Sequence, residues 1–579
     1  MNRVDTMPVV ASSPAASQQE KVRGLLAGST IQVIGLTTLA LAVRILLAAR
    51  SGLWRDEALF LFVVRSPSWT GMLDFLRFHE SHPPLFYAMM RLWLSVTGDT
   101  DAAALAVPVV IGVALVPLIY VVGTSLFSSR VGVLAAAFVA ISPSLSDYSS
   151  QVRPYSLLPL LALLSCYALI RGIERGGRTP WFAYVLSTLA LLYTHNWSWL
   201  VLAGEWAAVG VVITVGSDRP RVTMLRDWLV AQVMIAIGYL PWAHSLVFQT
   251  RHAGHEEVVI RGASDIVQFF AFSARALLQS TVLASSVEDG GMVDPLRGRL
   301  FVALPIIVLC VGQFLRIQQG YPVRTTRRSD AAEPGNLRER TALLVLVVVP
   351  IATWLSAMML SPRSNMILSR CLVTLAPPML LALAFWLGSQ RTRQMMPLAP
   401  VVVATLLATY ATSGWELMQT TRSNAKELAL TVTANSRPSD LLIIAPEWIA
   451  SSFNRYYGPN VEQIDFPEFG REGAIRFTAM RDRTVSQSAL IRVKRRITEA
   501  RRDERRVWLI IESAYVHEFT TEGITRALQA PGYIRPGIAR ANQVRAELVS
   551  QYGPPNTSFS GDSRRPQLEE LQAFLFIPP

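Results

Sequence analysis

Charge is scarce in this chain. Only 16% of its 579 residues are charged, whereas 51% are hydrophobic. In an average soluble domain roughly a quarter of the residues are charged. The deficit excludes an ordinary soluble protein and is typical of a polytopic membrane protein. The net charge of +13 does not indicate a nucleic-acid partner, because the cytoplasmic loops of membrane proteins collect arginine and lysine.

Cysteine is nearly absent as well. The three cysteines, Cys166, Cys310 and Cys371, lie in or beside apolar runs. No pair has the spacing of a metal site, and no disulfide framework is indicated. No cofactor follows from the sequence. A divalent metal is left open by a single His-x-x-His at residues 79–82, which is weak evidence for a metal site.

Long apolar runs dominate the chain instead. A helix needs ~20 apolar residues to cross a bilayer. We place the basic loops 171–178, 219–226, 316–340 and 391–393, and Arg130, on the cytoplasmic side, as the positive-inside rule requires. This gives eleven crossings, with the N-terminus inside and the C-terminus outside. The expected spans are residues 29–48, 103–126, 131–147, 155–171, 181–195, 198–215, 227–245, 300–317, 341–360, 371–389 and 396–413.

The membrane part is predicted to be residues 29–413, with external loops at 49–102 and 246–299. Residues 1–28 are polar and low in complexity, so we expect a disordered cytoplasmic tail before a retained signal-anchor helix. The apolar segment 85–96 is short, and counting it as a span would put every later basic loop on the wrong side. It is therefore predicted to be an interfacial helix.

Residues 414–579 differ in character from the membrane part. The stretches 439–448 and 505–513 are typical of buried strands, and the charged segment 488–505 between them is typical of a helix. We expect a small α/β domain outside the membrane. It has no glycine-rich phosphate loop and no metal motif, so the domain is expected to bind an acceptor or to be structural.

An acidic pair follows the first predicted span, in the stretch SGLWRDEALFLF at residues 51–62. A carboxylate held beside lipid is desolvated, which raises its pKa and its strength as a base. Asp56 or Glu57 could then take a proton from a hydroxyl group. Consecutive side chains point in different directions, so one of the two is expected to act while the other anchors the loop. The alternative is that the pair are solvated loop carboxylates paired with Arg55 and have no catalytic role.

Residues that bind anions gather at other external turns. His82 stands before a Pro-Pro pair that starts a helix, and we expect it to contact a phosphate or sugar. Arg153, two residues before Tyr155, lies beside the bilayer, where a guanidinium is costly unless it holds an anion; the alternative is snorkelling to lipid headgroups. His195 at a hairpin tip and Tyr155 are further candidates for contact with a phosphate or sugar, as is Arg370, which opens a late span.

Six short motifs follow one another in a specific order. They are Trp-x-Asp-Glu at 54–57, His-Pro-Pro-Leu-x-Tyr at 82–87, Tyr-x₄-Arg-x-Tyr at 148–155, Tyr-Thr-His at 193–195, Leu-Pro-Trp at 240–242, and the arginine at 370. The ordered set resembles the bacterial polyprenyl-phosphate-dependent glycosyltransferases of the C-type fold. These are relatives of the protein O-mannosyltransferases and of the lipid A aminoarabinose transferases.

The resemblance implies a multispanning all-α membrane protein of the bacterial inner membrane. Its activity would be the inverting transfer of a sugar from a polyprenyl phosphate to a glycan, glycolipid or protein hydroxyl on the periplasmic face. The resemblance assigns the base to Asp56, and neutralisation of the phosphate to His82, Arg153 and Arg370. Phosphate leaves without a proton, so one base suffices, whereas a glycosidase needs two carboxyl groups.

The sequence departs from these relatives at three places. Gln151 stands where they often carry Glu, Cys371 where they often carry Tyr, and Ser81-His82 where the aminoarabinose transferases carry Glu-Lys. The aminoarabinose substrate, and any metal site near that pair, are therefore not carried over.

Two other classes of protein remain open. A glycan polymerase or ligase that uses lipid diphosphates would also be multispanning, but would not need the early Asp-Glu pair. A flippase, transporter or scaffold would hold functional polar residues inside the spans, where only Glu205 and Gln232 stand out. The sequence names neither the sugar nor the acceptor.

Overall fold

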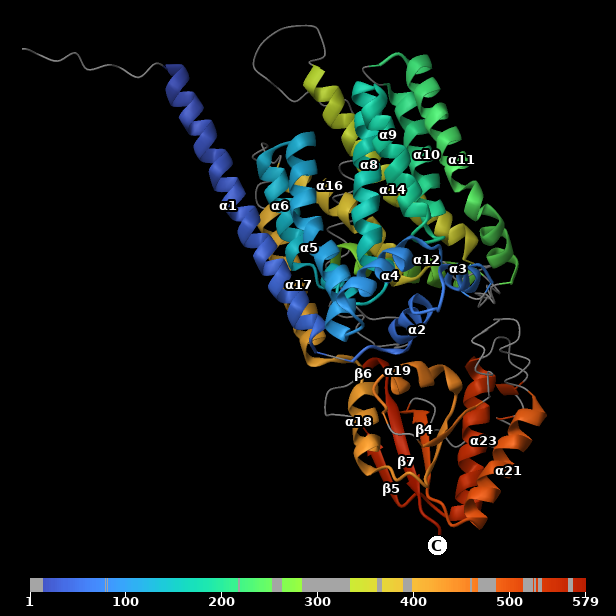
Figure 1. The fold of residues 1–579 in the computed structure, drawn as a ribbon. Coiled ribbons are helices and arrows are strands. Elements are labelled where there is room, and N and C mark those ends of the chain that lie inside the picture. The colour runs from blue at the N-terminus through green and yellow to red at the C-terminus, as the bar shows by residue number, and fades with distance from the viewer. Residues whose placement is uncertain are drawn as a thin grey trace, which may run out of the picture.

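A bundle of long helices carries a smaller α/β domain at its C-terminus in the computed structural model (Figure 1). The structure describes residues 14–50, 52–78, 80, 82–216, 219–252, 263–283, 334–361, 367–388, 398–458, 461–466, 486–513, 524, 527–528, 534–560 and 566–579.

Membrane-spanning helices make up most of the bundle. Among the described residues, eight helical segments are long and apolar enough to cross a bilayer, which confirms the predicted multispanning all-α class. They lie in α1 (Pro14–Ala48), α5 (Asp101–Leu126), α8 (Leu157–Arg175), α10 (Ser198–Val215), α11 (Arg221–His252), α14 (Pro334–Leu360), α15 (Ser369–Leu372) with α16 (Ala376–Gly388), and α17 (Leu398–Gln419).

Three predicted spans have a different outcome. The predicted span 131–147 is wrong in its extent, because two helices occupy this range. Helix α6 (Ser129–Ile141) ends at Ile141, and α7 (Pro143–Tyr148) begins at Pro143. The cause is local, because Pro143 has no N–H to continue α6 and Ser142 caps the new helix through Leu145 N–H. Helix α9 (Arg178–Leu192) is as long as the predicted span 181–195, but begins and ends earlier in the chain. Span 300–317 lies outside the described residues, so the number of eleven crossings stays a prediction.

The first helix is longer than the sequence indicated. It begins at Pro14, so the prediction of a disordered tail up to residue 28 is wrong for residues 14–28. Alanine, glutamine, glutamate and lysine in this segment favour a helix, and proline is well suited to a first helical position.

Small residues allow the helices of the bundle to approach closely. A Cβ atom added to Gly132 of α6 would lie 2.6 Å from the carbonyl oxygen of Tyr120 in α5. A Cβ on Gly204 of α10 would lie 2.6 Å from the carbonyl oxygen of Val349 in α14. Such close contacts are the usual basis of helix association in a membrane, where there is no hydrophobic drive between helices.

Three short helices cover the end of the bundle that faces the C-terminal domain: α2 (Arg55–Val64), α3 (Trp69–Phe78) and α4 (Leu85–Thr97) (Figure 1). Helix α4 coincides with the predicted interfacial segment. It buries Phe86 and Met90, yet exposes 59% of Leu92 and 85% of Val96. An apolar exposed face on a short helix suits the membrane surface.

The C-terminal domain is a five-stranded sheet of order β3-β2-β4-β7-β5 with helices on both faces (Figure 1). The predicted strands are present as β2 (Leu441–Ile444) and β4 (Val507–Glu512), which pair in parallel, and the predicted helix is α21 (Gln487–Arg502). Alternate side chains of these strands enter two apolar cores. The other elements are β3 (Glu462–Asp465), β5 (Thr557–Ser560), β7 (Leu571–Phe576), α18 (Ala425–Asn435), α19 (Ala450–Asn454) and α23 (Ile534–Tyr552).

A second, two-stranded parallel sheet joins the bundle to this domain. Strand β1 (Thr421–Ser423) directly follows α17 and pairs with β6 (Pro566–Glu569). Residues near the end of the chain are thereby brought to the point where the chain leaves the bundle. The boundary predicted at residue 414 falls inside α17 and stays a prediction.

Candidate active site

The acidic pair lies in the first turn of α2. The backbone N–H of Trp54, just before the helix, donates to Glu57 Oε2 at 3.1 Å. Carboxylates in a first turn also interact favourably with the unpaired N–H groups of the helix. The sequence thus starts a helix at Arg55 and fixes both carboxylates at its N-terminus.

Glu57 serves as an anchor. Its side chain is buried, and Oε1 accepts the Val152 N–H at 2.7 Å. Oε2 lies 3.8 Å from the guanidinium of Arg422 in β1. With both oxygens engaged by the protein, Glu57 holds α2 against the 149–153 turn. These contacts match the expectation that one carboxylate of the pair anchors the loop, and a catalytic role for Glu57 stays a prediction.

Asp56 points elsewhere and is partly exposed, with 27% of its side chain accessible. Burial raises the pKa of Asp56, but three guanidinium groups outweigh that effect and leave the pKa below its usual value. These groups belong to Arg55, Arg153 and Arg370. The expectation that the pKa of Asp56 is raised is therefore wrong. The sequence predicts that this carboxylate is desolvated, but it does not show that three arginines lie near it. Asp56 is a carboxylate at neutral pH.

Arg153 connects several of the predicted residues. One of its terminal nitrogens lies 3.4 Å from His82 Nε2, and the other donates to the backbone oxygen of Asp56 at 3.4 Å. Its guanidinium lies 5.8 Å from the ring centre of Tyr155. Among the described residues, its buried Nε has no hydrogen-bond partner. The structure thus places a buried cation with an unsatisfied donor beside Asp56.

His82 is held by a carboxylate. Its Nδ1 lies 2.6 Å from Glu80 Oε1, which assigns the ring proton to Nδ1. Burial lowers the pKa of His82, and the charge of Arg153 adds to this effect, so that together they outweigh the opposing influence of Glu80. The imidazole is therefore neutral, and the positive charge at this point comes from the arginines.

His195 completes the ring cluster. Its ring centre lies 4.8 Å from that of His82 and 6.3 Å from that of Tyr155. Its Nδ1 accepts the Trp197 N–H at 3.1 Å, so Nε2 carries the proton. Arg370 in α15 is half-buried and near enough to shift the pKa values of Asp56 and His82. The six residues Asp56, His82, Arg153, Tyr155, His195 and Arg370 therefore lie in one cluster.

Two residues that support this cluster were not predicted from the sequence. Gln249 in α11 donates to the carbonyl oxygens of Leu76 and Glu80 at 2.7 and 2.8 Å, and accepts from Asn196 at 2.8 Å. It fixes the His82 and His195 turns together. Its only sequence signal is a polar residue near the end of an apolar helix.

Arg422 is the second missed residue. It is buried, donates to Ser150 Oγ at 3.0 Å, and lies 3.8 Å from both Glu57 and Asp147. A buried arginine is costly unless it is paired, and here two carboxylates share it. Nothing in the sequence around residue 422 indicates this role.

The His-x-x-His at residues 79–82 is only partly described, because His79 lies outside the described residues. Within the described part of the chain, no three His, Cys, Asp or Glu side chains come together in a way that could hold a metal ion.

The two polar residues inside the spans bond to protein groups. Glu205 accepts from Ser165 at 2.6 Å and from Tyr184 at 3.0 Å. Gln232 donates to the same Tyr184 hydroxyl at 3.3 Å and accepts from Trp206 at 3.0 Å. This network joins α8, α9, α10 and α11, as interhelical hydrogen bonds in membranes do.

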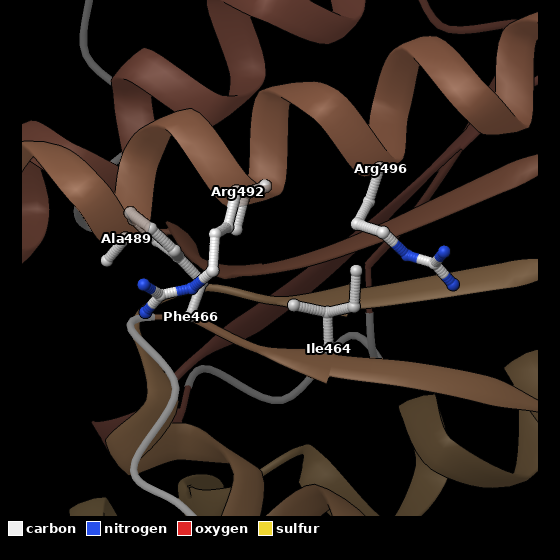
Figure 2. A pocket seen from close by; sticks show the side chains of 6 residues that line it. Ile464, Phe466, Ala489, Arg492 and Arg496 are labelled. Carbon is white, nitrogen blue, oxygen red and sulfur yellow. The ribbon is translucent and has the colours of Figure 1, made fainter.

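A small pocket on the C-terminal domain is separate from the cluster around Asp56. Figure 2 shows Arg492 and Arg496 of α21 projecting over Ile464 and Phe466 at the β3 edge of the sheet. Arg496 is ion-paired with Glu462 and Glu499. None of the six clustered residues lines this pocket.

Comparison with known proteins gives a partial family match. Residues 81–193 match the family described as dolichyl-phosphate-mannose-protein mannosyltransferase. This region holds His82, Arg153 and Tyr155. No significant match was found among curated protein sequences.

Solved structures give a wider match. The apo oligosaccharyltransferase of Archaeoglobus fulgidus superposes with a TM-score of 0.50 at 12% identity, over 88% of this chain and 72% of that one. That likeness confirms the fold class. ArnT from Cupriavidus metallidurans bound to undecaprenyl phosphate has a TM-score of 0.47 at 11% identity, over 93% and 97% of the two chains. AglB of A. fulgidus, with an inhibitory peptide and a dolichol-phosphate, has 0.48 at 12%, over 84% and 69%.

Proposed function

Because the chain is a multi-pass membrane protein with the fold of the C-type glycosyltransferases and a partial match to their mannosyltransferase family, we propose that it moves a monosaccharide from a polyprenyl monophosphate to an acceptor hydroxyl. The reaction takes place on the periplasmic face of a bacterial inner membrane. One observation carries the proposal: an ionised, partly exposed Asp56 lies beside the buried cation Arg153 at the end of the bundle. That arrangement suits a hydroxyl acceptor and a phosphate leaving group.

Asp56 is the base in this reaction. The acceptor oxygen forms a bond to the anomeric carbon as the bond from that carbon to the phosphate oxygen breaks. The electron pair leaves with the lipid phosphate, and the hydroxyl proton passes to Asp56. Attack from the face opposite the phosphate inverts the anomeric configuration.

Donor binding also tunes the base. In the free protein the nearby guanidinium groups hold the pKa of Asp56 below its usual value. A donor phosphate beside Arg153 and Arg370 offsets their charge, so the pKa of Asp56 rises once the donor is bound. The base therefore gains strength when a lipid phosphate is bound.

The leaving phosphate is stabilised by fixed cations. Arg153 offers its unpaired buried Nε–H, and a guanidinium matches the geometry of a phosphate. Arg370 adds a second positive charge. His195 can donate its Nε2–H, and the Tyr155 ring beneath Arg153 keeps the guanidinium in place. Such preorganised charge acts where negative charge develops, in a setting with little water.

The test compares a deletion strain with strains that express the native protein, Asp56→Asn, or the matched control Asp74→Asn at equal membrane abundance. Asp74 lies on α3 with 59% of its side chain exposed. Lipid phosphate sugars and envelope glycans are profiled by mass spectrometry. In the deletion strain we expect one sugar to leave a glycan while its polyprenyl-phosphate donor accumulates. Asp56→Asn should restore less than ~1% of the product, because a general base contributes about 10²–10⁴-fold, and Asp74→Asn should restore it fully.

Normal profiles with Asp56→Asn would reject the base assignment. Accumulation of a lipid diphosphate oligosaccharide in the deletion strain would instead favour the polymerase or ligase class. Unchanged profiles in all strains would favour a non-enzymatic role.

A further inference from the structure

We propose that Glu569 of the C-terminal domain is a positioning residue for the transfer reaction, because it caps the helix that carries Asp56. The functional part of this inference rests on the proposed transferase activity. Its structural part, that the domain holds the 53–56 turn, can be tested separately.

Glu569 is almost wholly buried, with 1% of its surface exposed. Its Oε2 accepts the backbone N–H of Arg55 at 3.2 Å and the hydroxyl of Ser423 at 2.8 Å. Its Oε1 accepts the hydroxyl of Ser452 at 2.7 Å. The carboxyl is therefore held on both sides by the C-terminal region while it bonds to the first residue of α2.

The N–H groups of a helix's first turn have no partner inside the helix. They are usually satisfied by a neighbouring side chain of the same segment. In α2 the Arg55 N–H is bonded instead to Glu569, a residue 514 positions further along the chain. The orientation of the first turn, and with it the direction of Asp56, therefore depends on the C-terminal domain.

Further bonds from the same domain act on the residues before Asp56. The hydroxyl of Tyr456 accepts the Leu53 N–H at 2.8 Å and donates to Asp101 at 2.7 Å. The hydroxyl of Ser451 donates to the Arg55 carbonyl at 3.3 Å. The backbone of this turn is thus bonded to the domain at both ends, directly before the proposed base.

The turn also packs tightly on the domain. A Cβ atom on Gly52 would lie 2.7 Å from the Cβ of Lys426. The substitution Gly52→Ala would therefore push the two parts apart without removing any hydrogen-bonding group. It serves as an independent way to loosen the same contact.

The side chain of Arg55 points to the same coupling. Its Nε lies 3.4 Å from Asp56, and one terminal nitrogen lies 4.0 Å from Glu512 at the end of β4. Arg55 is thus bound to the domain through its backbone and faces a domain carboxylate through its side chain. It is also one of the three cations that lower the pKa of Asp56.

The test uses the full chain in lipid nanodiscs. Hydrogen exchange is measured for a peptide that covers residues 53–57 in the native protein, Glu569→Ala, Glu569→Gln and Gly52→Ala. The matched control is Glu547→Ala, which removes a carboxylate paired with Lys494 on the far side of the domain. Peptides of β2 and β4 report whether the domain itself remains folded. Binding of undecaprenyl phosphate and the glycan profile in cells complete the set.

We expect residues 53–57 to exchange at least tenfold faster in Glu569→Ala and in Gly52→Ala, with β2 and β4 protected as in the native protein. Product formation should fall at least tenfold, while undecaprenyl phosphate binding changes less than twofold. Glu569→Gln keeps an oxygen for the Arg55 N–H and mimics the protonated form of Glu569, so at about pH 5.5 it should resemble the native protein in both respects. Glu547→Ala should resemble the native protein as well.

Unchanged exchange at residues 53–57 in Glu569→Ala would overturn the proposal. Faster exchange with unchanged product formation would overturn the positioning role. If the native protein transfers no sugar, the proposed function fails, and the exchange result alone then decides whether the domain holds the turn. If β2 and β4 lose protection in Glu569→Ala, the Gly52→Ala result decides instead.

Discussion

The charge balance around Asp56 decides what this carboxylate can do. The sequence predicts the carboxylate and the arginines separately. Only the structure shows that the arginines together outweigh desolvation and lower the pKa of Asp56. The resulting site is a carboxylate surrounded by guanidinium groups. In the proposed reaction a bound phosphate makes Asp56 a stronger base, which would couple donor binding to catalysis.

Arg153 is the most informative position for this balance. Arg153→Lys keeps the charge, but an ammonium cannot reach His82, the Asp56 carbonyl and a phosphate at once. We expect undecaprenyl phosphate to bind about tenfold more weakly in Arg153→Lys and about 100-fold more weakly in Arg153→Ala, a loss of roughly 1.4 and 2.7 kcal/mol. Microscale thermophoresis in nanodiscs measures this. Arg77→Ala, an exposed arginine on α3, is the control, and equal affinities in all variants would contradict the role.

Glu569 gives the contact a pH dependence. Burial raises its pKa to about 7 from a usual 4.5, although Arg55 and the hydroxyls of Ser452 and Ser423 oppose this and Glu512 adds to it. A raised acid pKa means that the folded surroundings of Glu569, which include its contact with the Arg55 N–H, favour the protonated form. These surroundings are therefore most stable below pH 4.5, and lose up to roughly 3 kcal/mol as the pH rises to about 7.

Hydrogen exchange of residues 53–57, corrected for the intrinsic rate, measures this effect. Between pH 5.5 and 7.5 we expect protection in the native protein to fall by about tenfold or more, in line with the linkage relation. Protection should stay constant in Glu569→Gln, which cannot ionise. A native protein whose protection is flat, or rises with pH, would contradict this assignment.

At the scale of elements, the apolar runs carry most of the information. The strands β2 and β4 and the helix α21 follow their sequence patterns, as do the long spanning helices. The errors arise where a local signal competes with hydropathy: Pro143 divides an apolar run into α6 and α7, and good helix formers extend α1 back to Pro14.

Close contacts between helices of the bundle depend on glycine, which has no side chain. In Gly132→Ala the new Cβ would lie 2.6 Å from a backbone oxygen of α5, so the helices must separate. We expect a loss of about 1–3 kcal/mol and a melting temperature several degrees lower by fluorescence. Gly210→Ala is the matched control, because no atom lies within 4 Å of its added Cβ. A similar melting temperature for the two variants would show that this contact does not limit stability.

At the scale of the whole molecule, the site is assembled from parts that lie far apart in the sequence. The residues of the candidate site come from the ends of α2, α9 and α15 and from the turns at 80–82 and 149–155. Their motifs were recognisable because they stand as polar groups between apolar runs. Gln249, Arg422 and Glu569 could not be predicted, because their roles depend on pairings with residues on other elements, up to 514 positions away.

The central claim is that Asp56 is the base of a sugar transfer from a polyprenyl phosphate. The most direct measurement uses purified protein in nanodiscs with the lipid phosphate sugar that accumulates in the deletion strain, and follows the release of polyprenyl phosphate and the anomeric configuration of the product. We expect the native protein and Asp74→Asn to release it at equal rates with inversion, and Asp56→Asn to be at least 100-fold slower without a loss of donor affinity. A native rate in Asp56→Asn, or a product that retains its configuration, would contradict the account.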